Sequence, residues 1–450
     1  MVCCTLLLTT VFIFDEKPEV TEPVQQWTRK VEGENIVSLE IVSRRYEAPG
    51  RPDVWLVGVA HIADSSFYDQ VASLLEGLDV VLYESVLPEG ARPPMGDTAE
   101  ERITSTKKSL VFVADTAAAA AEELEVMPLT MADVISDVSI LDRRLPGWLD
   151  DTSVDAWGNP IVLQVDEDSK TLTFTSYGAD EKVGGEGEAA DLVEIRSVEI
   201  ITFDEELTEE DIENEMTQED SEPNIQEEMA EVLGLEFQLD ALPYEEPNWF
   251  VSDLTIDEVE AKLEENGADT ALLDTLSGKS FVAKLASGIM QVVPLLDALS
   301  DGGATATARL LMIEVLSMAD SEQLMQGIEP NLQAVIIVDR NTEVLSDLAT
   351  VLDAVEDVST IGILYGAGHM VDLSQRMEKL FGYIPVEDKW FASMRVDPRE
   401  SLLDDGDMTR MRFMLKYQMY KQVDIHHINE YRLLIVHQIL GLQQKHQRLL

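Results

Sequence analysis

Three short and almost uninterrupted apolar runs constrain the fold of this 450-residue chain most strongly. They are 54–60 (VWLVGVA), 79–83 (DVVLY) and 360–365 (TIGILY), and amphipathic helical patterns follow the first and the last run, at 65–76 and 373–381. Strands that are apolar throughout and alternate with helices are typical of a parallel or mixed sheet covered on both faces. The sequence therefore predicts an α/β fold with a mixed or parallel central sheet flanked by helices.

Further segments extend this pattern. Residues 36–46 read as a strand, and the apolar run 334–338 (AVIIV) is predicted as a strand that leads into a helix over 342–355. Between the two halves, 117–125 is rich in Ala and Glu and is expected to be helical, and 232–316 reads as mostly helical.

Changes in composition divide the chain into parts. We expect a signal-like apolar N-terminus with a linker (1–34), the first half of the α/β domain (35–140), a small inserted β-rich module (141–203), an acidic linker (204–231), the second half of the α/β domain (232–393) and a helical C-terminal extension (394–450). The linker is half acidic with no basic residue, which predicts a solvated helix or a mobile segment. The extension could cover the sheet or form an oligomer through its helices.

The charge balance excludes some classes of function. The chain has 87 acidic and 32 basic residues, a formal net charge of −55. Such a surface repels phosphate backbones, so we expect no nucleic-acid partner, and it favours neutral or basic substrates. The chain has no apolar run of 18 residues, so we expect no stable membrane span.

The N-terminal segment 2–14 (VCCTLLLTTVFIF) is apolar and has the length of the core of an export signal. It lacks a basic start and a clear cleavage site, so a buried strand is the alternative. Cys3 and Cys4 are the only cysteines, so no disulfide framework or cysteine-based zinc site can form. We expect an extracytoplasmic protein of the periplasm or cell envelope.

Two segments of the chain repeat one another. They are Gly58-Val-Ala-His61-Ile-Ala-Asp64 and Gly366-Ala-Gly-His369-Met-Val-Asp372. Each follows an apolar strand and begins a helix, and ligands of α/β sheets bind at the carboxyl ends of the strands. Each glycine permits a close backbone approach before the imidazole. Each aspartate either caps the next helix or contacts the imidazole, and the sequence favours capping.

Glu84 adds a carboxylate to the two imidazoles. It ends the strand at 79–83, one helix after His61, and a right-handed crossover would bring both to one sheet edge. Two imidazoles and a carboxylate can form a divalent-metal site with open positions for water or substrate. The alternative is a pair of structural histidines, but the matching contexts of His61 and His369 favour a functional role.

These motifs resemble the TraB/PrgY family, including its GumN-type and TIKI-type members. The resemblance rests on GVAH and DVVLYE, then VDRN, then LYGAGH followed by a helix and FGY, and covers roughly residues 35–110 and 230–393. It implies a fold akin to erythromycin-esterase and ChaN-like proteins. It also implies a metal-dependent hydrolase site, described in TIKI-type members as a manganese or cobalt metalloprotease site.

The resemblance assigns roles to matching residues. His61, Glu84 and His369 would be the metal or catalytic residues, and Arg340 and Asn341 match the Arg-Asn pair of the family. Arg340 could stabilise an anionic intermediate or bind a substrate carboxylate. Its alternative is a surface arginine at the start of a helix. The pair here follows an aspartate, where relatives often have glutamate.

The inserted module resembles the C-terminal part of the major pseudopilin of type II secretion. The similarity lies in 155–160 (DAWGNP), 174–180 (FTSYGAD) and 184–192 (GGEGEAADL). In that family this loop binds calcium, and Asp180 and Asp191 would supply hard oxygen ligands here. The alternative is an acidic turn without a metal.

Together these patterns predict a metal-dependent hydrolase that acts on a peptide or protein substrate with Mn, Co or Zn, and that can also hold calcium. Glu84 would be either a metal ligand or the base that takes a proton from water. The alternative from another class is a non-catalytic protein that binds and sequesters a peptide signal, as the PrgY resemblance allows. A third reading is a scaffold that acts through its β module and basic tail.

Overall fold

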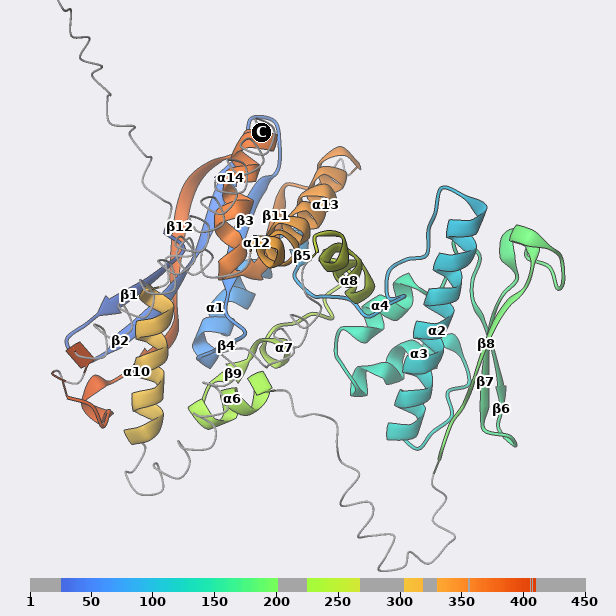
Figure 1. The fold of residues 1–450 in the computed structure, drawn as a ribbon, viewed down its shortest axis with the longest axis horizontal. Helices are drawn as coiled ribbons and strands as arrows, with labels where there is room; N and C mark the ends of the chain where they lie inside the picture. The colour runs from blue at the N-terminus through green and yellow to red at the C-terminus, as the bar shows by residue number, and fades with distance from the viewer. Residues whose placement is uncertain are drawn as a thin grey trace, which may run out of the picture.

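The computed structural model describes residues 26–200, 225–267, 303–318, 330–354, 357–404, 406 and 408–409. The apolar segment 2–14, most of the acidic linker and nearly all of the C-terminal extension beyond 404 lie outside these residues, so the expectations for them stay predictions. The described chain is a mixed α/β protein whose central sheet is mixed and flanked by helices, as the sequence predicted (Figure 1).

Seven strands form the central sheet, in the order β1-β2-β3-β11-β5-β10 with β12 also paired to β2. Their bounds are β1 Thr28–Glu32, β2 Val37–Glu47, β3 Asp53–Val59, β5 Val80–Tyr83, β10 Trp249–Val251, β11 Thr360–Gly366 and β12 Ile384–Val396. β3, β11, β5 and β10 run parallel, whereas β2 is antiparallel to β1, β3 and β12. The sheet therefore joins a parallel half to an antiparallel half.

Both faces of the parallel half are buried, and alternate side chains of β3 show why. Val54 and Leu56 join a cluster with α13 (Arg340–Ala354) and α14 (Met370–Phe381), while Trp55 and Val57 join a cluster with α1 (Ser65–Leu75). Successive side chains of a strand point to opposite faces, so a strand between two helical layers must be apolar at every position. This explains the continuous apolar runs.

Other elements complete the sheet unit. They are β4 (Ile62–Ala63), α6 (Ile225–Leu233), β9 (Glu236–Phe237), α7 (Gln238–Ala241), α8 (Ile256–Glu265), α10 (Gly303–Met318), α12 (Pro330–Gln333), η7 (Ala367–His369) and η8 (Pro398–Glu400). The Thr255-x-x-Glu258 spacing predicts a capping box, and α8 begins with one. In the part of the chain that is described, no helix combines the length and apolarity needed to cross a bilayer.

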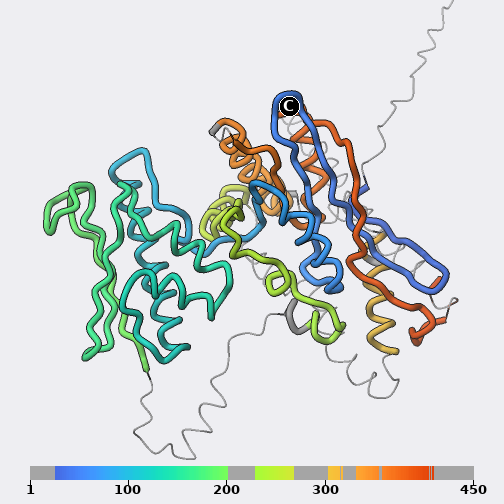
Figure 2. Tube along the Cα trace, turned by 180° about the vertical axis from the view of Figure 1, so that it is seen from behind, coloured from blue at the N-terminus to red at the C-terminus, as the bar shows by residue number. Residues whose placement is uncertain are grey.

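A second, lateral unit comprises residues 99–198. Its helices are α2 (Ala99–Glu123), α3 (Met131–Asp137), η1 (Val138–Ile140) and α4 (Leu145–Asp151), and short 3-10 turns η2 (Gly178–Asp180) and η3 (Gly187–Ala189) precede its last strand. An antiparallel sheet follows the helices, made of β6 (Val162–Asp166), β7 (Thr171–Ser176) and β8 (Leu192–Ser197). Helices and strands share one apolar cluster, so the packed unit begins well before residue 141, the start that composition indicated. Figure 2 shows it beside the central sheet.

The run 334–338 is not the strand that the sequence predicted. It lies in η6, a π-helical segment over Ala334–Asp339 that continues from α12 into α13. A five-residue apolar run fits a buried strand and a buried helix equally well, and here the helical neighbours on both sides decide. Val335 and Ile337 are buried in this helical form. The adjoining prediction of a helix over 342–355 is confirmed by α13.

Candidate functional site

Three parallel strands end side by side at the site. β11 lies between β3 and β5, with Gly366 opposite Val59 and Leu364 opposite Tyr83. Because the pairing is parallel, the segments that follow these strands meet at one edge of the sheet. The two Gly-x-x-His segments and Glu84 therefore start from neighbouring strands, as the sequence predicted.

Glu84 is held at this edge from two sides. Its Oε2 accepts a hydrogen bond from the Gly366 N–H at 2.5 Å, and its Oε1 lies 2.7 Å from Nη2 of Arg340. Burial opposes its charged form, but the charges of His369, Arg340 and His61 and the Gly366 N–H lower the pKa of Glu84 to about 2. Glu84 is therefore ionised at neutral pH.

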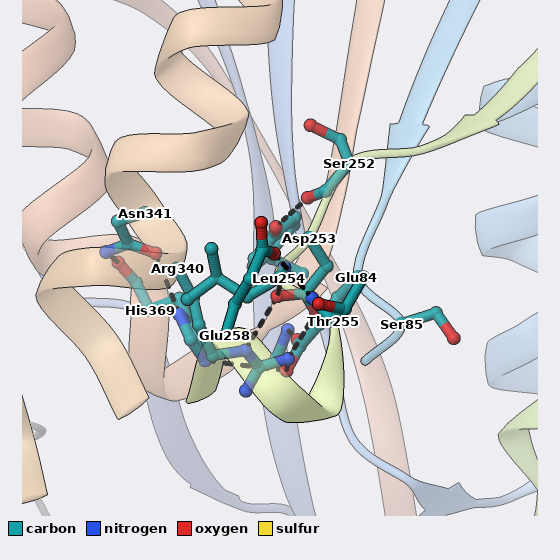
Figure 3. Close-up of polar contacts among 12 residues, drawn as sticks. Glu84, Ser85, Ser252, Asp253, Leu254, Thr255, Glu258, Arg340, Asn341 and His369 are labelled. Carbon is teal, nitrogen blue, oxygen red and sulfur yellow. Dashed lines mark hydrogen bonds and ion pairs between the residues drawn. The ribbon is translucent and has the colours of Figure 1, made fainter. Parts of the chain in front are cut away.

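Arg340 links Glu84 to a second buried carboxylate, Asp253. Its Nε donates to Oδ1 of Asp253 at 2.9 Å, and its Nη2 donates to Oδ2 at 2.5 Å. The Asp253 side chain is 0% exposed and that of Arg340 only 9%. The alternative of a surface arginine is therefore wrong: the guanidinium lies between two carboxylates, which balance its charge (Figure 3).

The orientation of the His369 ring is fixed by Asn341. The Asn341 Nδ2 donates to Oδ2 of Asp372 at 2.8 Å and to the His369 carbonyl at 3.2 Å, so its Oδ1 faces Nδ1 of His369 at 2.7 Å. An amide oxygen only accepts, so Nδ1 carries the proton and Nε2 has the free lone pair in the neutral ring.

The Nε2 atom of His369 faces Glu84. The distance from Nε2 to Oε1 of Glu84 is 3.5 Å, and the His369 side chain is 7% exposed. Burial, reinforced by the charge of Arg340, lowers the pKa of His369 despite the opposing charge of Glu84. At neutral pH two hydrogen-bond acceptors thus face each other, with the proton of the imidazole on its far side.

His61 lies on the outer side of the site. It follows β3, its residue is exposed, and its carbonyl accepts a hydrogen bond from the Gln238 N–H at 2.8 Å. Its charge contributes to the lowered pKa of Glu84. Among the residues that the structure describes, no three His, Cys, Asp or Glu side chains are gathered as a metal-holding group.

The two aspartates of the repeated segments do not cap as the sequence favoured. Asp64 is at the N-cap of α1 without a side-chain cap, because its carboxylate accepts from Arg309 and from the Arg395 N–H. Asp372 lies in the first turn of α14 and contacts Asn341, which in turn contacts the imidazole. The less favoured alternative therefore applies to Asp372, through an intermediary.

The two motif glycines permit close approach rather than unusual backbone angles. A Cβ on Gly366 would lie 3.2 Å from Oε2 of Glu84, and a Cβ on Gly58 would lie 3.0 Å from the side chain of Ile41. Gly366 thus gives its N–H access to the carboxylate, whereas Gly58 accommodates core packing.

The candidate calcium residues lie in the lateral unit. Both carboxylate oxygens of Asp191 accept from the Gly184 N–H, at 3.0 and 2.9 Å, and Asp180 accepts from the Lys182 N–H at 3.2 Å. Asp180 contacts its own turn and Asp191 contacts the loop seven residues before it, and the calcium role stays a prediction.

Sequence reasoning took Ser252 and Asp253 for an N-cap-like pair before a helix and missed the pairing of Asp253 with Arg340. Asp253 follows the three-residue strand β10, which was not recognised within a segment read as mostly helical. The run WFV, followed by Ser252 and Asp253, was the available signal, since a polar pair after a short apolar run marks a strand end.

Comparisons with family models, with curated proteins and with solved structures give no match. The functional conclusion therefore depends on the geometry of the site and on the motifs that the sequence carries.

Proposed function

We propose that this chain is a metal-dependent hydrolase of the TraB/GumN type that acts on peptide amide bonds outside the cytoplasm. One observation carries the proposal: the neutral His369 ring and the ionised Glu84 direct two acceptor atoms at each other across 3.5 Å. A cation shared between them would relieve this repulsion. An imidazole binds a metal in its neutral form and a carboxylate in its ionised form, so His369 and Glu84 both have the protonation state that metal binding requires.

The donor set fits a divalent ion in its chemistry. The hydrogen bond from Nδ1 of His369 to Asn341 is the kind of outer contact that orients a ligating histidine. Glu84 retains lone pairs beyond those used by Arg340 and Gly366, since a carboxylate has about four acceptor sites. The exposed His61 is not gathered with these two residues into a three-ligand group, and it would have to turn inward to become the third ligand.

A bound divalent ion would supply a Lewis acid that polarises a substrate carbonyl and lowers the pKa of water. The lowered pKa keeps Glu84 ionised at neutral pH, the form in which a carboxylate binds a metal, which favours its role as a ligand. Arg340, whose charge Glu84 and Asp253 already balance, would position the Glu84 carboxylate for metal binding.

Metal analysis of the purified protein, paired with a peptide-library cleavage screen under manganese, cobalt and zinc, tests this proposal. We expect about one bound ion per chain and metal-dependent cleavage. A chain that takes up none of the three metals and cleaves no peptide would contradict it.

A non-catalytic peptide binder is the second candidate. It is favoured by the engagement of both Glu84 oxygens with Arg340 and Gly366, which reduces the capacity of Glu84 to act on a substrate. A His61→Ala variant separates the two functions. The enzyme should lose cleavage and keep most of its peptide affinity, whereas a binder shows no turnover even as the wild type.

Two finer proposals accompany this function. We propose that the sheet unit is akin to erythromycin-esterase and ChaN-like folds, in line with the parallel half of its sheet. We also propose that the loop with Asp180 and Asp191 holds calcium, supported by its Gly-rich sequence and carboxylates.

A further inference from the structure

A cavity of about 470 Å³ lies where the lateral unit meets the sheet unit. Its wall includes Arg92 and Met95 from the loop after β5, Glu100 and Lys108 from α2, and Asp257 and Glu258 from α8. Small-molecule and peptide side-chain sites commonly have this size and lie between structural units. No residue of the proposed metal site lines it.

The cavity and the proposed metal site share one segment of chain. Thr255 lines the cavity, and two residues earlier Asp253 holds Arg340 against Glu84. Arg92 of the cavity wall donates a hydrogen bond to the Asp253 carbonyl. Figure 3 shows Thr255 and Glu258 beside these site residues. The connection from β10 to α8 therefore contributes to both sites, so a peptide bound at Glu84 would lie next to the cavity.

The charges of the cavity favour a cationic ligand. Its two basic residues are already paired: Lys108 contacts Asp257 at 2.6 Å and Glu89 at 3.1 Å, and Arg92 contacts Glu343 at 3.0 Å. Glu100 projects from the first turn of α2 and, among the described residues, no hydrogen bond or ion pair engages it.

A second carboxylate oxygen at this wall has no partner. Oδ1 of Asp257 is buried and has no hydrogen-bond partner among the described residues. That atom is closed off from the cavity, so the carboxylate left open to a ligand at the wall is that of Glu100, while Lys108 and Arg92 are already paired. Met95 and Pro93 add apolar surface that suits an aliphatic stem.

We propose that this cavity is a specificity subsite that receives a lysine or arginine side chain of the peptide substrate. This inference rests on the proposed function, because it names the substrate class of that site. The methylene stem would lie along Met95, and the cationic head would reach the Glu100 carboxylate.

Direct binding to the full chain tests the subsite without any need for turnover. The probes are Ac-Ala-Ala-Lys-Ala-Ala-NH₂ and the matched peptide with norleucine, which keeps the stem and lacks the charge. We expect the lysine peptide to bind about fivefold more tightly in calorimetry. In spectra of ¹³C-methyl methionine, it should shift the Met95 resonance, which a Met95→Leu variant identifies.

Glu100→Gln should weaken the lysine peptide about threefold and leave the norleucine peptide unchanged. Glu123→Gln, the same change at the far end of α2, should alter neither. Equal affinities for the two peptides, absence of binding at millimolar concentration, or equal behaviour of the two variants would overturn the proposal. If selective binding occurs without metal-dependent cleavage, the subsite stands and the hydrolase proposal fails, so the two failures are distinguishable.

Discussion

The two units of the molecule each bury a carboxylate, and they satisfy it in different ways. In the lateral unit, Asp155 is 2% exposed and accepts hydrogen bonds from the Trp157 and Asn159 N–H groups and from the Ser176 hydroxyl. All three donors are neutral, and two of them lie within four residues of Asp155 in the chain. In the sheet unit, the partners of Glu84 lie more than 250 residues away and include a cation.

The difference separates a structural carboxylate from a functional candidate. Asp155 takes two of its three donors from its own turn and the third from Ser176 on β7 of the same unit. Glu84, Arg340 and Asp253 come together only when the sheet is assembled, and burying them costs desolvation that hydrophobic residues would avoid. Strongly perturbed carboxylates of this kind cluster at functional sites, which makes Glu84 the functional candidate.

The largest expected effect is that of Arg340→Met. It would leave Glu84 and Asp253 buried without their shared cation, so we expect the free energy of unfolding to fall by about 3–5 kcal/mol. Urea unfolding followed by tryptophan fluorescence measures it. Arg196→Met is the matched control in the lateral unit, where partly exposed pairs with Asp115 and Glu194 should contribute at most about 1 kcal/mol. Equal losses in both variants would break the comparison.

Asp155→Ala should have the next largest effect. It removes an acceptor from three buried or half-buried donors, which costs about 2 kcal/mol. The cost should appear as faster proteolysis within residues 99–198, with metal uptake unchanged. Asp155→Asn keeps one acceptor oxygen and should be milder. Loss of metal uptake in Asp155→Ala would contradict the purely structural role of Asp155.

A smaller effect is expected from Gly366→Ala. The new Cβ would lie 3.2 Å from Oε2 of Glu84 and displace the carboxylate by a few tenths of an ångström. We expect metal affinity to fall about tenfold, as for other disturbed outer contacts of metal ligands, with stability lowered by about 1 kcal/mol. Gly368→Ala meets open space and is the control. Calorimetric titration with metal measures the affinity of both variants. Equal affinities of Gly366→Ala and Gly368→Ala would show that Gly366 has no special role.

The smallest expected effect concerns Asp79, which connects β5 to the start of β11. Hydrogen bonds from the Ser359 and Thr360 N–H groups lower the pKa of Asp79 below its usual 3.8. A carboxylate with a lowered pKa stabilises the fold above its unfolded pKa, and loses that contribution as the pH falls through the lowered value. The stability difference between wild type and Asp79→Asn should therefore shrink below pH 3.8. A difference independent of pH would contradict this cause.

The sequence predicted the parallel half of the fold well, because strands buried on both faces leave continuous apolar runs. It predicted the meeting of Glu84 with the His369 segment for the same reason, since parallel strands end at a common edge. It could not distinguish a strand from a helix at 334–338, because a short apolar run fits both.

Other features depend on contacts that no local pattern carries. The Asp64 carboxylate accepts its hydrogen bonds from Arg309 and Arg395, which come close to it only in the folded chain. The role of Asp253 depends in the same way on Arg340, 87 residues later. Long-range ion pairs of this kind leave no periodicity in the sequence.

The most direct test compares peptide cleavage by Glu84→Gln and by Asp155→Asn, because the account makes Glu84 functional and Asp155 structural. Each variant is first refolded to the wild-type circular dichroism spectrum and supplied with manganese. We predict that Glu84→Gln loses at least about 100-fold in rate while Asp155→Asn stays near wild type. Wild-type cleavage by a folded Glu84→Gln variant would contradict the account.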